Sequence, residues 1–352
     1  MRQILAVRHG RSLAIFVCAA ATLAWPHDRS RAESTTAASF YAGKQITLVV
    51  GTGPGGGYDA YARLVARYMK AHIPGQPNIV VQNMPGSAGV AAAAYMYNVA
   101  RRDGTFIAAN PPDYLLAELW SPEQMRFDSR KFGWLGTVST ITDVLTVFRS
   151  SGVQTIADAR TKELTIGATA AIATNSLEPA LANALLGTKF RILKGYNGGS
   201  DPMTLAMGRG EIDGRANSWA SWKLLRPNWI AEHLLSFLLQ FGPKAPDLPP
   251  GVPAMADLAT TKRDKDFVSM LGITQYTGRA MFTTPDVPSE CLEALRTAFD
   301  LTMADPTFAA EMTKLAFDLH PQKGADLQAA IERAMRERDG VMPQLKALLS
   351  LD

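Results

Sequence analysis

Apolar and polar positions alternate along this chain in a way that predicts strands followed by helices. Short apolar runs such as Ile46–Val50 and Ile79–Gln82 have the length and composition of buried strands. Between them, residues 59–72 repeat their apolar positions with the period of a helix. The same pattern predicts further strands at Thr105–Ala109, Trp134–Val138, Val144–Phe148, Leu164–Ala168, Phe190–Tyr196, Ile212–Asn217, Leu234–Phe241 and Ala280–Thr283.

This alternation occurs in two runs, which predicts an α/β fold with two lobes and a mostly parallel sheet in each lobe. The strand at Ala280–Thr283 is interpreted as one that returns to the first sheet, and the residues after it as helices. We therefore predict that residues 40–143 and 275–352 form lobe I and that residues 144–274 form lobe II.

The first 32 residues have the layout of a secretory signal peptide. Three arginines within the first eleven residues precede an apolar stretch at residues 13–25, and residues 30–32 offer a small-x-small cleavage site. The apolar stretch is shorter than the roughly 20 residues of a membrane-spanning helix. We expect a signal peptide at residues 1–32, a polar tether at residues 33–39, and a secreted, periplasmic protein.

Removal of this leader changes the charge of the chain. The whole chain has a formal net charge of +4, but residues 1–32 hold five arginines and one aspartate, so 31 basic and 31 acidic residues remain. A net charge of 0 gives no electrostatic basis for nucleic-acid binding. Cys291 is then the only cysteine, which excludes an internal disulfide.

Four loops rich in small residues join a predicted strand to a predicted helix: "GTGPGGGYD", "PGSAG", "TAAIATNS" and "YNGGSD". The first turn of a helix has unpaired N–H groups and partial positive charge, so such helix starts bind carboxylates or phosphates. Ligands of open α/β sheets lie beyond the carboxyl ends of strands. We expect two loops from each lobe to face each other across a cleft, although any one loop could be an ordinary turn.

The first loop also matches the dinucleotide pattern G-x-G-x-x-G at Gly51, Gly53 and Gly56. That pattern requires an acidic residue after the second strand, and the chain reads Gln82-Asn83-Met84 there, so a nucleotide is not expected. Asp59 follows the glycines at a helix start, where a structural hydrogen bond to the backbone is the first interpretation. Direct contact with a ligand is the alternative.

The chain resembles the substrate-binding proteins of tripartite tricarboxylate transporters, the Bug or TctC-like family. The similarity is carried by "FYAGKQITLVVGTGPGGGYDAYARLVARYM", "PNIVVQNMPGSAGVAAAAYMYNVARRDGT", "KGYNGGSDPMTLAMGRGEIDGR" and "GRAMFTTPDVP", and spans roughly residues 40–350. It implies a periplasmic binding protein of the type II, Venus-flytrap kind, which holds a small carboxylate between its lobes.

The resemblance also implies which residues contact that carboxylate. They are Gly55, Gly56, Tyr58 and Asp59 in the first loop, Gly86, Ser87, Ala88 and Gly89 in the second, Thr169, Ala170, Thr174 and Asn175 in the third, Tyr196, Gly198 and Gly199 in the fourth, and Asn217 at a strand end. Asn217 stands where many members have an aspartate, which removes one reason to expect a positively charged group on the ligand.

We therefore expect a monomeric solute-binding protein that captures a small organic carboxylate and delivers it to the membrane permease subunits of a tripartite transporter, without a cofactor or metal. An alternative is an extracytoplasmic sensor partner whose closed form docks on a receptor. An α/β enzyme acting on a carboxylate is a third hypothesis, but the sequence offers no nucleophile–base pair. If the loops bind the ligand, Gly56→Val and Ser87→Pro should abolish binding and leave the fold largely intact.

Overall fold

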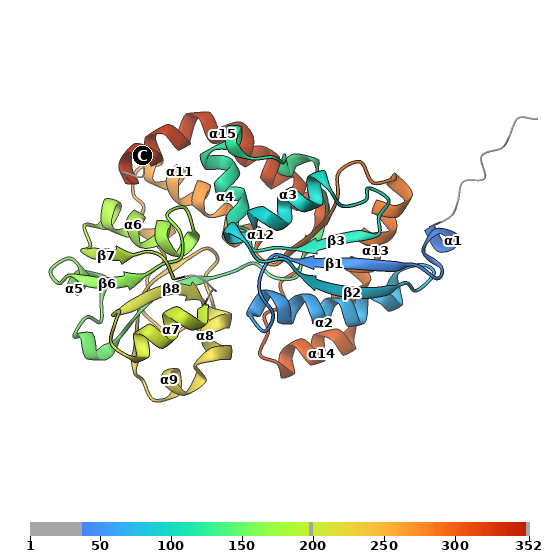
Figure 1. The fold of residues 1–352 in the computed structure, drawn as a ribbon. Helices are drawn as coiled ribbons and strands as arrows, with labels where there is room; N and C mark the ends of the chain where they lie inside the picture. Colours follow the sequence, from blue (N-terminus) through green and yellow to red (C-terminus); the bar gives the residue numbers. More distant parts are fainter. Residues whose placement is uncertain (1–36, 197–199, 350–352) are drawn as a thin grey trace, which may run out of the picture. The chain divides into compact units, whose positions relative to one another are not determined.

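The computed structural model describes residues 37–196 and 200–349, all of which belong to one unit, residues 35–352. Its strands form two sheets (Figure 1). The first sheet contains β1 (Gln45–Val50), β2 (Asn78–Asn83), β3 (Phe106–Ala109), β4 (Gly133–Thr137), β10 (Ala280–Thr283) and β11 (Gln322–Lys323). The second contains β5 (Asp143–Phe148), β6 (Leu164–Gly167), β7 (Phe190–Leu193), β8 (Gly214–Ser218) and β9 (Leu235–Phe241).

Helices connect and cover these strands. Those of the first half are α1 (Ala37–Tyr41), α2 (Gly57–His72), α3 (Val90–Asn98), α4 (Asp113–Trp120), α5 (Ile156–Ala159), α6 (Thr174–Leu186) and α7 (Ser200–Gly208). Those of the second half are α8 (Trp219–Leu225), α9 (Pro227–Ala231), α10 (Met255–Leu258), α11 (Lys262–Leu271), α12 (Ile273–Thr277), α13 (Ser289–Ala304), α14 (Pro306–Lys314) and α15 (Gly324–Leu349). Short 3-10 turns lie at Ser87–Gly89, Pro122–Gln124, Ser129–Lys131 and Arg149–Ser151.

Both sheets are mixed, so the prediction of mostly parallel sheets is wrong in this respect. In the first sheet, β1 pairs in parallel with β2 and β3, whereas β10 runs antiparallel to β3 and β4, and β11 to β4. In the second, β6 is parallel to β7 and β8, whereas β5 is antiparallel to β8 and β9. The apolar pattern of a segment indicates that it is buried, but not in which direction its strand runs within the sheet. The antiparallel strands β5 and β10 are the ones that the chain enters after it crosses from the other sheet.

The chain passes between the sheets twice. It leaves the first sheet after β4 and enters the second at β5, and it returns between the end of β9 and the start of β10. The two-lobed α/β class is confirmed. The exact lobe boundaries stay a prediction.

The alternation along β1 explains how helices cover both faces of the first sheet. Ile46, Leu48 and Val50 are buried with residues of α2 and α13, whereas Val49 is buried with residues of α3 and α4. Successive side chains of a strand point to opposite faces, so one apolar run supplies two cores. Burying a side chain of this size contributes roughly 1.5–3 kcal/mol.

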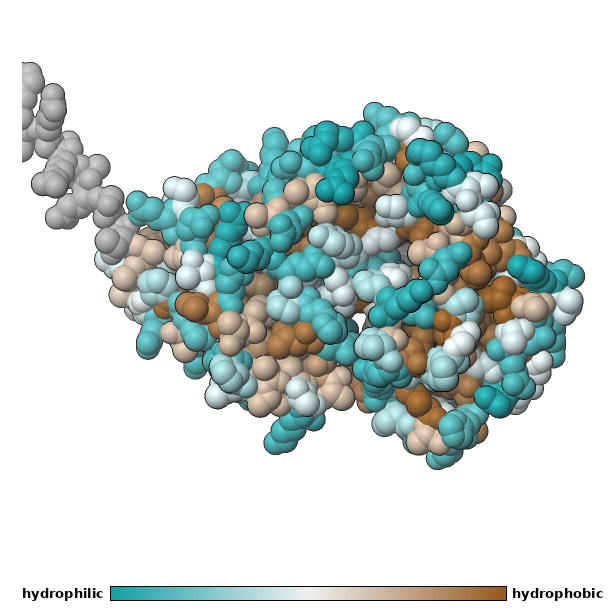
Figure 2. All heavy atoms as spheres, turned by 180° about the vertical axis from the view of Figure 1, so that it is seen from behind, coloured by the Kyte–Doolittle hydropathy of each residue, from teal (hydrophilic) through white to brown (hydrophobic). Residues whose placement is uncertain are grey.

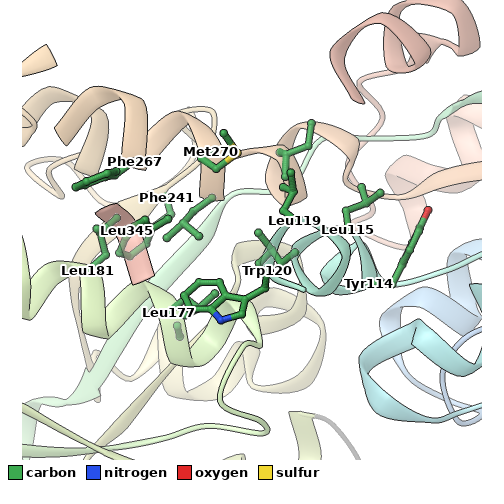
Figure 3. Close-up of a cluster of buried hydrophobic side chains, with 14 of the residues drawn as sticks. Tyr114, Leu115, Leu119, Trp120, Leu177, Leu181, Phe241, Phe267, Met270 and Leu345 are labelled. Atoms are coloured by element: carbon green, nitrogen blue, oxygen red, sulfur yellow. The ribbon is translucent and has the colours of Figure 1, made fainter. Parts of the chain in front are cut away.

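One hydrophobic cluster joins helices that accompany both sheets (Figure 3). It contains Trp120 of α4, Leu177 of α6, Phe241 of β9, Phe267 of α11 and Leu345 of α15. The last helix, α15, packs against β4 as well as against α6 and α11. The end of the chain therefore helps to hold both sheets in one unit.

Element ends differ from the predictions where turns intervene. β7 ends at Leu193, three residues before the predicted end, and Gly195 follows with a φ of +107°. β8 begins at Gly214 and not at Ile212. Residues 37–39 of the predicted tether belong to α1, while the predicted signal peptide lies outside the described residues.

The face shown in Figure 2 carries both hydrophilic and hydrophobic residues. Exposed large apolar side chains include Val99, Leu224, Leu301 and Leu315, and Leu224 and Leu315 line the same surface hollow. Within the described part of the chain, no helix is both long enough and apolar enough to cross a membrane.

Candidate functional site

The edge of the first sheet where β1, β2 and β3 end carries the first and second predicted loops. Gly51, Asn83 and Asn110 directly follow or end these parallel strands. Because β10 runs antiparallel to β3, its first residue lies at the same edge, and Arg279 precedes it. The topology therefore places the cation Arg279 at this edge, and the prediction based on the four loops does not include it.

Asp59 stabilises the conformation of the first loop through hydrogen bonds. Its carboxylate is 3% exposed and accepts hydrogen bonds from the backbone N–H of Gly55 at 2.9 Å, from Arg63 at 2.9 Å and from the side chain of Asn83 at 2.8 Å. Burial alone would raise the pKa of Asp59, but these hydrogen bonds outweigh it and lower the pKa. Its oxygen atoms are thus engaged within the protein, which supports the structural interpretation of Asp59.

Asn110 explains why Gly51 and Gly89 have no side chain. A Cβ added to Gly51 would lie 1.7 Å from the Asn110 side-chain oxygen, and one added to Gly89 would lie 2.6 Å from it. The Asn110 amide nitrogen donates to the Gly89 carbonyl at 3.0 Å. Asn83 also bridges the loops, because its amide nitrogen donates to the Thr52 carbonyl at 2.9 Å. The structure therefore brings the first and second loops together.

Gly56 presents a different situation, because its conformation requires no glycine. Its φ of −81° and ψ of 172° are open to any residue, and a Cβ there would meet nothing within 4 Å. It precedes α2 as an N-cap without a side-chain hydrogen bond. Gly55 and Gly56 are both exposed, so a ligand has access to the backbone at this helix start.

The second loop is a tight turn with backbone strain. Ser87 and Ala88 are exposed and have φ values of 46° and 53°, and Gly89 follows at 92°. A Cβ on Gly86 would lie 2.9 Å from the Ala91 side chain. The expectation that Ser87→Pro leaves the fold intact is therefore wrong, because proline fixes φ near −65°.

The third loop is tied to α4. The backbone N–H and the hydroxyl of Thr174 both donate to one carboxylate oxygen of Asp113, at 2.7 and 2.6 Å. Burial raises the pKa of Asp113, although the two hydrogen bonds from Thr174 oppose that rise. The anion at the start of α6 is thus a carboxylate of the chain itself, and it links elements next to the two sheets.

Other residues of this loop bond to one another or are accessible. The N–H and hydroxyl of Thr169 donate to the Asn175 side-chain oxygen at 3.1 and 3.2 Å, while Ala170 is exposed. The N–H of Gly195 donates to the Thr169 carbonyl at 2.9 Å, and that of Tyr196 to the Ala168 carbonyl at 3.2 Å. The third and fourth loops therefore meet at one edge of the second sheet.

Asn217 lies near the carboxyl end of β8, opposite Val144 of β5. It shares this edge of the second sheet with Asp143, the first residue of β5. Gly198 and Gly199, the remaining predicted residues, lie outside the described residues.

A group of polar residues lies at the chain passages between the sheets: Gln275 and Glu178 are buried, and Asp143 is half-buried. The Gln275 amide nitrogen donates to Asp143 at 3.0 Å and to Glu178 at 2.7 Å. Burial raises the pKa of Asp143 to about 6 and raises the pKa of Glu178 well above its ordinary value. Sequence reasoning missed this group because its members are more than 30 residues apart and no motif connects them. Among the described residues, no His, Cys, Asp or Glu cluster could hold a metal ion.

Tyr58 and Arg279 complete the site on the side of α2. The Arg279 guanidinium lies 4.9 Å from the ring centre of Tyr58 and 4.0 Å from that of Tyr61. Burial raises the pKa of the Tyr58 hydroxyl well above its usual value, with Arg279 opposing the rise, so this hydroxyl stays neutral. Tyr58 was predicted from the first loop, whereas Arg279 was not.

This fold, with two mixed α/β sheets joined by two passages, is that of two-lobed periplasmic binding proteins. No profile of a known protein family and no curated protein sequence matches the chain. The solved periplasmic binding protein BugD is similar over 87% of this chain and 98% of its own, with a TM-score of 0.67 at 15% identity.

Two further solved structures resemble the chain to a comparable degree. An R. palustris protein solved with adipate gives a TM-score of 0.66 at 19% identity, and covers 87% of this chain and 97% of its own. MatC from Rhodopseudomonas palustris with bound malate gives 0.63 at 15% identity, with 87% and 99% covered. The resemblance to Bug proteins is confirmed at the level of the fold.

Proposed function

We propose that this chain is a periplasmic solute-binding protein of the Bug or TctC kind, which captures a small organic carboxylate between two lobes. The observation that carries the proposal is the placement of the loops. The first and second loops share one edge of the first sheet, and the third and fourth share one edge of the second. Asp113 and Thr174 connect these edges.

The chemistry of these edges suits a carboxylate. The helix start at α2 supplies backbone N–H groups, and the exposed small residues Gly55, Gly56 and Ala170 allow close approach. Two structural neighbours were solved with the small dicarboxylic acids adipate and malate, which supports the same class of ligand for this chain. Lobe I would comprise residues 40–143 and 275–352, and lobe II residues 144–274.

The wider role extends this proposal. The protein is exported by the predicted signal peptide, acts as a monomer, and presents its ligand to membrane permease subunits. It binds and does not transform the acid, so incubation with the bound acid should leave that acid unchanged by mass spectrometry. Conversion of the acid to a product would favour the enzyme hypothesis instead.

The proposal is tested by the thermal unfolding of the purified protein in the presence of succinate, malate, adipate, citrate or benzoate. A ligand present at 100 times its Kd stabilises the native state by about 2.7 kcal/mol, so Tm should rise with the concentration of at least one acid. Sodium chloride at matched ionic strength is the control. If no acid raises Tm above this control, the proposed function fails.

A further inference from the structure

Arg279 is a buried cation without an ionic partner in the described part of the chain. Its side chain lies just before β10 and is 5% exposed. The terminal nitrogen Nη1 has no hydrogen-bond partner. Asp143 interacts electrostatically with this guanidinium, but no carboxylate of the described residues forms an ion pair with it. A charge removed from water is costly unless it is paired, so this position favours a bound anion.

The surroundings of Arg279 point toward the first loop. The rings of Tyr58 and Tyr61 lie 4.9 and 4.0 Å from the guanidinium and compensate part of its charge. A Cβ built on Gly57 would lie 3.6 Å from Nη1, from Nη2 and from the hydroxyl oxygen of Ser221. The guanidinium therefore faces the first residue of α2, together with a hydroxyl from α8.

The start of α2 adds a favourable electrostatic field at this point. The helix spans 16 residues, and its N-cap Gly56 makes no side-chain hydrogen bond to the first turn. N–H groups of a first turn lack helical partners and carry partial positive charge. A guanidinium, a helix start and a hydroxyl thus converge, whereas the two Thr174 donors at the start of α6 are already bound to Asp113.

We propose that Arg279 anchors a carboxylate of the ligand at the start of α2. This inference rests on the proposed function and adds the residue that selects for negative charge. A planar guanidinium can donate to both oxygen atoms of one carboxylate, which gives stronger and more directional binding than backbone N–H groups alone. Arg279 then decides between an acid and its uncharged analogues.

Calorimetric titration of wild type, Arg279→Gln, Arg279→Lys and Arg263→Gln tests this role. Arg263 is the matched control, because it lies 5.8 Å from the Phe267 ring centre but is exposed and paired with Asp264. The probe is whichever of succinate, malate, adipate, citrate or benzoate stabilises wild type most. We expect Arg279→Gln to raise Kd about 100-fold, Arg279→Lys about 10-fold, and Arg263→Gln less than about 2-fold.

A second measurement does not depend on any variant. The primary amide of the same acid should bind wild type about 100-fold more weakly than the acid does, because it offers no charge to Arg279. Equal Kd values for wild type and Arg279→Gln would overturn the inference and leave the proposed function standing. If Arg279→Gln does not fold, an unchanged Kd in Arg279→Lys together with equal binding of acid and amide would overturn it. Wild type that binds none of the acids would refute the proposed function first.

Discussion

Gly56 is the residue at which binding and folding can be separated most cleanly. Its backbone angles suit any residue and nothing in the described structure lies within 4 Å of a Cβ there. Gly51 and Gly89 differ, because Asn110 occupies the space that their side chains would need. Glycine is therefore required at Gly51 because no side chain fits there, whereas at Gly56 a side chain has room. The sequence motif alone does not distinguish these two cases.

We predict that Gly56→Val keeps the fold and loses the ligand. Valine accepts the extended conformation of this position, so the free energy of unfolding should fall by about 1 kcal/mol or less. Its branched side chain would cover the start of α2, so the rise in Tm caused by the acid should disappear. Gly340→Val on α15 is the matched control, since Gly340 is also exposed with nothing within 4 Å. A cooperative unfolding transition with the acid-induced shift intact would contradict this prediction.

Glu118 offers a test of buried charge at the residue scale. It lies on α4, is 5% exposed, and accepts a hydrogen bond from the Ser129 N–H at 3.0 Å. Burial raises its pKa from 4.5 to about 7, despite the opposing hydrogen bonds from Ser129. A carboxyl whose pKa is raised by folding stabilises the protein below pH 4.5, and this contribution is lost as the pH rises through 7.

We therefore expect Glu118→Gln to change the pH dependence of stability. The free energy of unfolding of the variant, relative to wild type, should increase by about 3 kcal/mol between pH 4.5 and pH 8. Urea denaturation across this range measures the difference. Glu293→Gln, at an exposed position paired with Arg296, should show no such trend. If the free energy of unfolding depends on pH in the same way for wild type and Glu118→Gln, burial does not raise the pKa of Glu118.

At the scale of elements, the starts of α4 and α6 are held together by Asp113 and Thr174. We predict that Thr174→Val destabilises the protein by about 1–3 kcal/mol at pH 7.5, because it leaves the partly buried carboxylate of Asp113 with one donor fewer. A double-mutant cycle with Asp113→Asn, measured by urea denaturation, should give a coupling energy of about 1 kcal/mol or more. Additive effects of the two substitutions would mean that this contact does not join the elements.

The positions of the strands were predictable because buried residues of strands and helices form recognisable apolar patterns in the sequence. The run Ile46–Val50 and the helix at residues 59–72 are both confirmed. Strand direction was not predictable, because it depends on which sheet the chain has just left. Arg279 was missed for the same reason, since only the antiparallel entry of β10 brings it beside the first loop. Asp113 was missed because its partner Thr174 lies 61 residues away.

At the scale of the whole molecule, the resemblance to Bug proteins predicted the architecture, and the structural neighbours confirm it at identities of 15–19%. The predicted ligand contacts stay a prediction. Asp59 and Thr174 have their hydrogen-bonding groups occupied by the chain itself, whereas Gly56 and Ala170 remain accessible. We therefore propose that the ligand lies at the start of α2, next to Arg279 and between the two sheet edges.

Amide hydrogen exchange with and without the most stabilising acid tests this placement most directly. We expect slower exchange in residues 53–58, 86–89 and 169–175 when the acid is bound, and unchanged exchange in α15. Protection in α15 or elsewhere, with these three loops unaffected, would contradict a carboxylate site between the two sheet edges.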